Sequence, residues 1–248
     1  MHPVKKPSIL ILVILTSALF SFAATKNAAS PKINWISYSP VTKISNTIDL
    51  DNPKALFSEL HLEEAGMKQS VFNSAIHGLQ KLDEKGAIQR NDIITIIDYS
   101  QPSNMKRLYV LDLLNKQILF NTLVAHGRNS GTLWARSFSN NLSSLKSCPG
   151  FYVTGETYMG DNGYSLRLDG MEKNINDHAR ARSIVLHGAS YVDPFAINSL
   201  GFLGRSWGCP AVPEDVHEEM IDSIKDGTCL FIYSPNRNYL RNSRILNS

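Results

Sequence analysis

The chain has 248 residues, of which 43% are apolar and 19% are charged, and its formal net charge is +3. A chain of this size and composition can bury a core without disulfides or metals to support it. Its lysines and arginines are scattered rather than gathered in runs, which argues against a nucleic-acid partner and leaves only a weak attraction to anionic surfaces.

The first 23 residues have the pattern of a secretory signal peptide. Lys5 and Lys6 precede an apolar run over residues 9–22, and Ser21-Phe22-Ala23 offers small residues where a signal peptidase reads. The run is shorter than the roughly 20 residues of a membrane span. We therefore expect an exported protein of the periplasm or cell envelope. An uncleaved segment that tethers the protein transiently to the membrane is the alternative.

Residues 24–90 are interpreted as a linker followed by a helical brace. The segment to about residue 50 is rich in Ser, Asn, Thr, Pro and Lys, as linkers are. Asp51-Asn52-Pro53 then predicts a helix start, because a capping residue precedes a proline at the first helical position. A second helix is predicted over residues 70–84, where apolar residues recur at helical spacing and Gly86 follows.

After residue 90 the pattern changes to short apolar runs bounded by turn residues, which predicts strands. A single helix is predicted over 214–225, and residues 235–248 are expected to be a polar tail. Residues 91–234 are therefore predicted to form an α+β, β-rich domain on an antiparallel or mixed sheet, preceded by a short helical region. The predicted strands are 92–98, 106–112, 117–125, 150–155, 164–168, 183–186 and 228–233.

Two segments carry residue types suited to nucleophilic catalysis. His187 follows the predicted strand 183–186 and precedes Gly188, and Cys209 lies in the turn-prone stretch 204–212. A thiolate is the reactive form of cysteine, and a nearby imidazole can generate it. We expect Cys209 to be the nucleophile and His187 its base. Gly188 leaves room for a backbone carbonyl to fix the imidazole tautomer.

Neighbouring residues have expected supporting roles. Gly208 permits a close approach of backbone to substrate, and the amides of Gly208 and Cys209 are candidate donors to an oxyanion. The Ser206 hydroxyl is expected to orient the site, and Trp207 to shape the substrate pocket. His126 is expected either to line the cleft or to be structural.

The order of these motifs resembles the murein L,D-transpeptidase catalytic domain family, often called YkuD-like. The match rests on His187-Gly188 and Ser206-Trp207-Gly208-Cys209, and it extends over about residues 90–234. Further stretches that resemble this family are 107–112, 121–127 and 150–156. The resemblance implies a thioester acyl-enzyme, peptidoglycan stem tetrapeptides as substrates and 3–3 cross-links as products. It implies no metal and no organic cofactor.

The sequence also departs from the family pattern. Trp207 stands where a histidine is common, and Pro210-Ala211 follow the cysteine where an arginine is common. Arg205 is the candidate that supplies the missing charge. Water as acyl acceptor, which gives an L,D-carboxypeptidase or endopeptidase, remains an alternative, as does a non-catalytic wall-binding module. A structural zinc site on Cys209, His187 and another cysteine is a third alternative.

The chain has three cysteines, and an odd count in an exported protein indicates one free thiol. If Cys209 carries out chemistry, Cys148 and Cys229 are free to pair. Cys148 close to Cys209, forming a regulatory disulfide, and Cys148 as a plain buried thiol are the other two possibilities.

Overall fold

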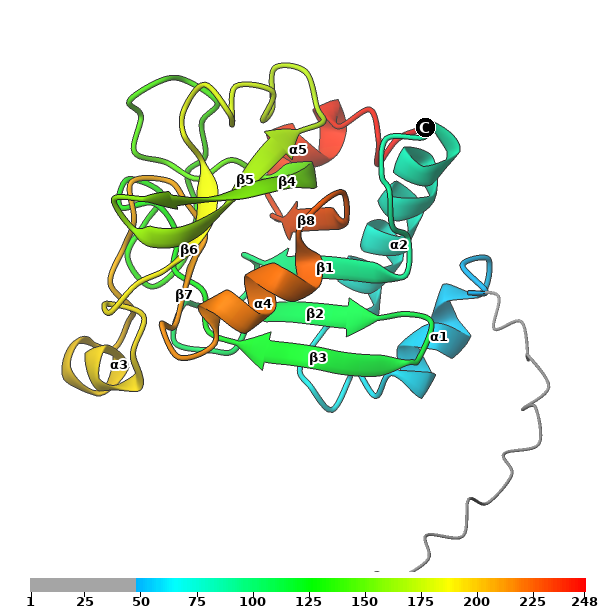
Figure 1. Ribbon diagram of the computed structural model, residues 1–248, viewed down its shortest axis with the longest axis horizontal. Helices are drawn as coiled ribbons and strands as arrows, with labels where there is room; N and C mark the ends of the chain where they lie inside the picture. The colour runs from blue at the N-terminus through cyan, green and yellow to red at the C-terminus, as the bar shows by residue number, and fades with distance from the viewer. Residues whose placement is uncertain (1–47) are drawn as a thin grey trace, which may run out of the picture. The chain divides into compact units, whose positions relative to one another are not determined.

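The computed structural model describes residues 48–248, so the predicted signal peptide and nearly all of the linker lie outside the described residues. Eight strands form one sheet in the order β3-β2-β1-β8-β4-β5-β6-β7 (Figure 1). The pairs β1–β8 and β6–β7 are parallel and the others antiparallel, which confirms a mixed sheet. The strands are β1 Ile93–Asp98, β2 Leu108–Asp112, β3 Gln117–Thr122, β4 Gly150–Gly160, β5 Gly163–Gly170, β6 Val185–Gly188, β7 Ala211–Val212 and β8 Cys229–Tyr233.

Both faces of the sheet are covered, which explains why β1 is apolar almost throughout. Ile94 and Ile96 face one hydrophobic core, and Ile93 and Ile97 face the other. Successive side chains of a strand point to opposite faces, so a central strand buried on both sides has no solvent face to mark with polar residues. Among the described residues the helices are α1 Pro53–Glu59, α2 Gln69–Glu84, α3 Pro194–Leu200, α4 His217–Ile224 and α5 Arg237–Asn242.

The predicted helical region is confirmed, and it covers one face of the sheet. Asn52 caps α1 by accepting a hydrogen bond from the Ala55 amide, and Pro53 occupies the first turn as predicted. In α2 the apolar stripe that includes Phe72 and Leu79 is fully buried in the first core. The brace is therefore held by apolar packing, which contributes about 25 cal/mol for each Å² of apolar surface buried.

The predicted polar tail is wrong. Residues 237–242 form α5, and the side chains of Tyr239 and Ile245 are buried in the same core as α1 and α2. A buried carboxylate, Glu172, fastens this segment, because the hydroxyls of Tyr239 and Ser243 both donate hydrogen bonds to it. Leu240 and Leu246 also pack against this core, so the segment is held by apolar contacts as well as by Glu172.

The second face carries α4, which buries Met220, Ile221 and Ile224. The predicted helix 214–225 is thus confirmed in shorter form. Besides α5, two elements were not predicted: α3 and the two-residue strand β7. The signal for α3 was present, because Asp193-Pro194 repeats the cap-and-proline start of α1.

The two edges of the sheet meet. After β3 ends, Ala125 forms an isolated bridge with Ala211 in β7, and the Ala125 amide donates a 2.8 Å hydrogen bond to the Ala211 carbonyl. The segment that follows β3 therefore meets β7, the last strand of the sheet. This seam, where 123–128 runs beside 204–212, contains the predicted site residues of the turn before β7, and His187 and Gly188 lie beside it on β6, which pairs with β7.

No helix within residues 48–248 has the length and apolar character needed to cross a membrane.

Candidate active site

Cys209 lies at the seam, two residues before its chain enters β7. Its thiol is half-buried and lies 3.5 Å from both the Ser183 carbonyl oxygen and the Val185 amide nitrogen. Burial raises the pKa of the Cys209 thiol, and the Val185 N–H only partly opposes this. At neutral pH the resting side chain is therefore a protonated thiol.

His187 lies within β6 and pairs with Ala211 of β7, so it is not at the end of a strand as predicted. Its Nδ1 lies 2.7 Å from the Gly188 carbonyl oxygen. A carbonyl only accepts, so Nδ1 must carry the proton and Nε2 the lone pair. Burial, with a smaller contribution from the nearby His217, lowers the pKa of His187. The ring is thus neutral and in the tautomer that a base needs.

The Ser206 hydroxyl forms two hydrogen bonds within the turn that carries Cys209. It donates a 2.6 Å hydrogen bond to the Cys209 carbonyl and accepts one of 3.1 Å from the Gly208 amide. The Ser206 backbone is itself fixed, because its amide donates to the His126 carbonyl and its carbonyl accepts from the Arg128 amide. The predicted orienting role of Ser206 therefore agrees with its contacts.

Gly208 is constrained by the protein's own backbone. Its φ is +134°, and an added Cβ would lie 2.9 Å from the Lys146 carbonyl oxygen. A larger side chain at this position would therefore collide with the loop that contains Lys146. The Gly208 amide is also occupied by Ser206, which leaves the Cys209 amide as the one of the two predicted donors that is still available for an oxyanion.

Position 188 has room only for glycine because of a neighbour, His217, that is not among the predicted site residues. An added Cβ at Gly188 would lie 2.7 Å from the His217 ring, which packs directly against it. His217 is fixed by a 2.8 Å contact between its Nδ1 and the Glu214 carbonyl. Gly188 and His217 belong to the wall of a cleft of about 490 Å³ that lies beside His187.

His126 is structural, so the prediction that it lines the substrate cleft is not supported. The side chain is fully buried, with Nδ1 2.9 Å from the Arg107 guanidinium and Nε2 3.3 Å from the Gly131 carbonyl. Burial lowers the pKa of His126 to about 4, and the charge of Arg107 adds to this. Arg107, itself fully buried, also donates two hydrogen bonds to the Val124 carbonyl and so supports one side of the seam.

The possible bridge between Cys148 and Cys229 does not form. All three cysteines are free, and Cys229 faces the first core whereas Cys148 faces the second. Cys148 contacts Arg182, which also donates to the carbonyls of Ser139 and Lys146. Arg182 therefore holds the loop 139–148 against the segment that leads into β6. The Cys209 thiol lies near the same segment, at Ser183 and Val185.

Arg205 and Trp207 precede Cys209 in the same turn-prone stretch, by four and two residues. Both are exposed, Trp207 by 74%, and both line a shallow cleft of about 310 Å³. The Arg205 guanidinium reaches the carbonyls of Arg128 and Gly131 at 3.4 and 3.3 Å, and it still faces solvent. The positions predicted to contact substrate are therefore accessible, in contrast to His126.

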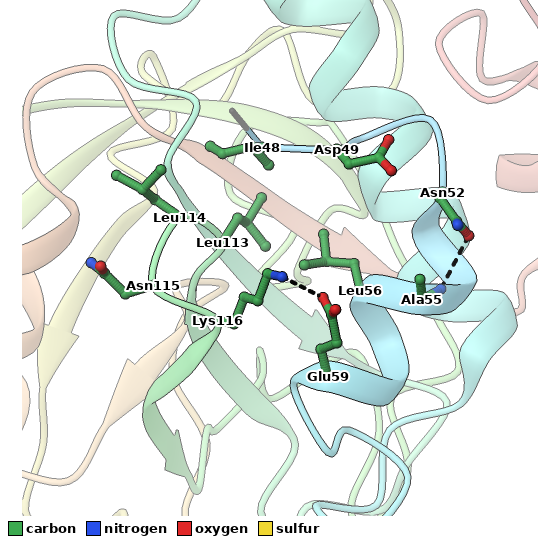
Figure 2. A pocket seen from close by; sticks show the side chains of 10 residues that line it. All are labelled: Ile48, Asp49, Asn52, Ala55, Leu56, Glu59, Leu113, Leu114, Asn115 and Lys116. Carbon is green, nitrogen blue, oxygen red and sulfur yellow. Dashed lines mark hydrogen bonds and ion pairs between the residues drawn. The ribbon is translucent and has the colours of Figure 1, made fainter. Parts of the chain in front are cut away.

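A separate pocket of about 360 Å³ lies between α1 and the turn 113–116 (Figure 2). Glu59 and Lys116, which face each other across it, form an ion pair of 2.9 Å. Since its opposite charges already pair and it contains none of the predicted site residues, this pocket offers no catalytic arrangement. Within residues 48–248 no group of three or more His, Cys, Asp or Glu side chains is placed to hold a metal ion.

Comparison with protein families gives a match to the L,D-transpeptidase catalytic domain over residues 63–233. The chain belongs to this family. The match begins before the predicted domain start at residue 91 and includes α2. A search of curated protein sequences gives no match.

Among solved structures, the chain is similar to an L,D-transpeptidase from Mycobacterium smegmatis, with 11% identity, a TM-score of 0.37, and 58% of this chain and 59% of that chain covered. L,D-transpeptidase 3 from Mycobacterium tuberculosis gives 12% identity, a TM-score of 0.37, and coverage of 58% and 61%. The helical cell shape determining protein Pgp2 from Campylobacter jejuni gives 16% identity, a TM-score of 0.40, and coverage of 64% and 55%. The similar region thus spans less than two thirds of each of these chains.

Proposed function

We propose that this protein transfers acyl groups between peptidoglycan stem peptides through a thioester on Cys209. The observation that carries the proposal is the tautomer of His187, whose Nδ1 proton is held by Gly188 so that Nε2 has a free lone pair. His187 lies in β6, and Cys209 lies two residues before β7, the strand that pairs with β6. The neutral imidazole and the neutral thiol are the proposed base and nucleophile, and they need a substrate to complete the proton transfer.

In the first half-reaction, Sγ of Cys209 attacks the carbonyl carbon of the third stem residue while Nε2 of His187 accepts the thiol proton. The Cys209 N–H is the proposed donor to the oxyanion. As the tetrahedral intermediate collapses, the peptide C–N bond breaks, and the His187 imidazolium gives its proton to the leaving D-Ala amine. The product is a thioester on Cys209.

In the second half-reaction, an amine of another stem attacks the thioester carbonyl. His187 accepts a proton from that amine, and the C–S bond breaks. The released sulfur takes the proton back, which regenerates the thiol and leaves a 3–3 cross-link. Ser206 serves as a positioning residue in both steps, because it holds the Cys209 carbonyl and hence the direction of the thiol.

We place the donor stem in the cleft of Arg205 and Trp207. A guanidinium is suited to a stem carboxylate, and an exposed indole offers an apolar face to the peptide chain. The charge of Arg205 would thus replace that of the arginine that is common after the cysteine in this family.

The test is to incubate the purified protein with disaccharide-tetrapeptide and to identify the products by mass spectrometry. A cross-linked dimer with release of D-Ala supports the transpeptidase. If disaccharide-tripeptide is the only product, the acyl acceptor is water and the protein is an L,D-carboxypeptidase. If the substrate is unchanged, the protein is a non-catalytic wall-binding module.

We further propose the chain organisation that this function requires: a cleaved signal peptide at 1–23, a linker and helical brace at 24–90, and a catalytic domain at 91–234. The protein would then act outside the cytoplasmic membrane, where its substrate lies. N-terminal sequencing of the exported protein is the test. A first residue near Ala24 agrees with export and cleavage, whereas an intact Met1 in the cytoplasmic fraction contradicts both.

A further inference from the structure

A cleft of about 620 Å³ lies between the loop 138–149, the segment 173–175 and the C-terminal residues from 236 onward, which include α5. These three segments are far apart in the sequence, and the cleft exists only because the C-terminal residues fold onto the domain. Its lining contains two cations, five asparagines and no acidic residue: Phe138, Ser139, Asn140, Pro149, Lys173, Asn174, Ile175, Asn236, Asn238, Tyr239, Asn242 and Arg244.

The two cations of the cleft are free to bind a ligand. Lys173 and Arg244 are exposed, and neither forms an ion pair or a side-chain hydrogen bond among the described residues. No carboxylate lines the cleft. In the adjoining segment, Asp177 accepts hydrogen bonds from Asn140 and from the Asn174 amide, and the buried Glu172 accepts from Tyr239 and Ser243. The two cations of the lining therefore have no carboxylate partner among the described residues.

The amides divide into those that build the cleft and those that remain available. Asn140 is bonded on both sides of its amide, and Asn236 caps α5 through Oδ1. The side chains of Asn174 and Asn242 have no hydrogen-bond partner among the described residues, and both are exposed. An amide both donates and accepts, so this pair suits hydroxyl and acetamido groups, which do the same.

Together these features define the ligand by its chemistry. Free cations select carboxylates, and free amides select a chain rich in hydroxyl and acetamido groups. We propose that this cleft binds a carboxylate-bearing saccharide, namely a glycan strand of peptidoglycan with its stem peptides, in addition to the stem held at the active site. The proposal rests on the proposed function, since it names a further part of the same polymer as the ligand.

The cleft is also connected to the active site by one loop. Ser139 and Pro149 line the cleft, and between them the loop is held by Arg182, which donates to the carbonyls of Ser139 and Lys146. The Lys146 carbonyl in turn contacts Gly208, the residue before the nucleophile. A strand bound in the cleft thus lies against the opposite side of the loop that supports Cys209.

The test uses the full exported chain with Cys209→Ala, so that binding is measured without turnover. The probe is a purified muropeptide tetrasaccharide with tetrapeptide stems, titrated by calorimetry. We expect Lys173→Ala/Arg244→Ala to bind it about tenfold more weakly, because two charge-assisted contacts are lost. We also expect a weaker dependence of binding on salt in this variant.

The matched control is Lys54→Ala/Lys85→Ala, which removes the same charge from two exposed lysines on α1 and after α2. This control should bind like the parent protein, and uncharged chitotetraose should bind the parent more weakly than the muropeptide. Equal binding by the cleft variant and the parent, or an equal loss in the control, would overturn the inference, as would equal affinity for chitotetraose. A protein with Cys209 intact that binds the probe but shows no turnover would contradict the proposed function and leave the cleft standing.

Discussion

The Ser206 hydroxyl donates a 2.6 Å hydrogen bond to the carbonyl oxygen of Cys209, three residues along the chain. The Ser206 hydroxyl oxygen also accepts a hydrogen bond from the Gly208 amide, so one small side chain closes the turn that carries the thiol. Because the turn also carries a glycine at a φ of +134°, its shape depends on contacts rather than on an intrinsic backbone preference.

Ser206→Ala should therefore lower kcat by about tenfold to a hundredfold, because the thiol loses its fixed direction. It should also cost about 1–3 kcal/mol of stability through the unpaired Gly208 amide. Steady-state kinetics and urea denaturation measure the two effects. Ser206→Thr, which keeps the hydroxyl, should recover much of both. Ser199→Ala, at an exposed position on α3, is the control and should change neither.

The alkylation rate of Cys209 should rise with pH and reach half its maximum above the ordinary thiol pKa of about 8.5. Burial raises the pKa of Cys209 and lowers that of His187, so both shifts disfavour a resting thiolate–imidazolium pair. The sequence had led us to expect the reverse, a base that increases the thiolate fraction at neutral pH.

A neutral Cys209 thiol beside a neutral His187 leads to a second expectation for the alkylation experiment. His187→Ala should leave the alkylation profile of the free protein almost unchanged, yet it should lower the rate of turnover by roughly a hundredfold or more. A profile that shifts to higher pH in His187→Ala would contradict the neutral pair and restore the ion pair. Unchanged turnover in this variant would remove His187 from the mechanism.

His126→Ala should act on stability rather than on chemistry. It leaves a cavity and removes the Nδ1 partner of the buried Arg107, which should cost about 2–4 kcal/mol in the free energy of unfolding. The pH profile of turnover by the folded fraction should keep its shape. A displaced profile with unchanged stability would instead place His126 in direct contact with the reacting groups.

Tyr239→Ala should destabilise the protein by about 3 kcal/mol, since it empties a buried site and removes one hydroxyl from Glu172. Thermal or urea unfolding measures the loss. Arg237→Ala, at the exposed start of the same helix, is the control and should lie within about 0.5 kcal/mol of wild type. Equal stability of Tyr239→Ala and wild type would mean that the C-terminal residues form a detachable tail after all.

Much of the fold could be predicted because its signals are local. The caps of α1, the stripe of α2 and the apolar run of β1 each depend on a few adjacent residues. The anchoring of Tyr239 and Ile245 could not be predicted, because it depends on a core built by distant segments. The same holds for β7, whose two residues become a strand only through pairing with β6.

The three residues predicted to carry the chemistry stand in a recognisable local order. The structure places Cys209 and Ser206 at the seam and His187 on β6, which pairs with β7. Arg107, Arg182 and His217 were missed, because each acts through a partner far away in the sequence. The sequence left open whether His126 lines the cleft or is structural, because its strand–His–Gly context matches that of His187. Both rings are buried, and the contact with the buried Arg107 is what identifies His126 as structural.

The central claim is that acyl transfer passes through a thioester on Cys209, and intact-protein mass spectrometry during turnover of disaccharide-tetrapeptide tests it most directly. We expect a transient mass increase equal to the donor minus D-Ala, located on the peptide that contains Cys209 and absent in Cys209→Ala, which should fold normally and release no D-Ala. A donor adduct on any other residue, or wild-type release of D-Ala by Cys209→Ala, would contradict the account.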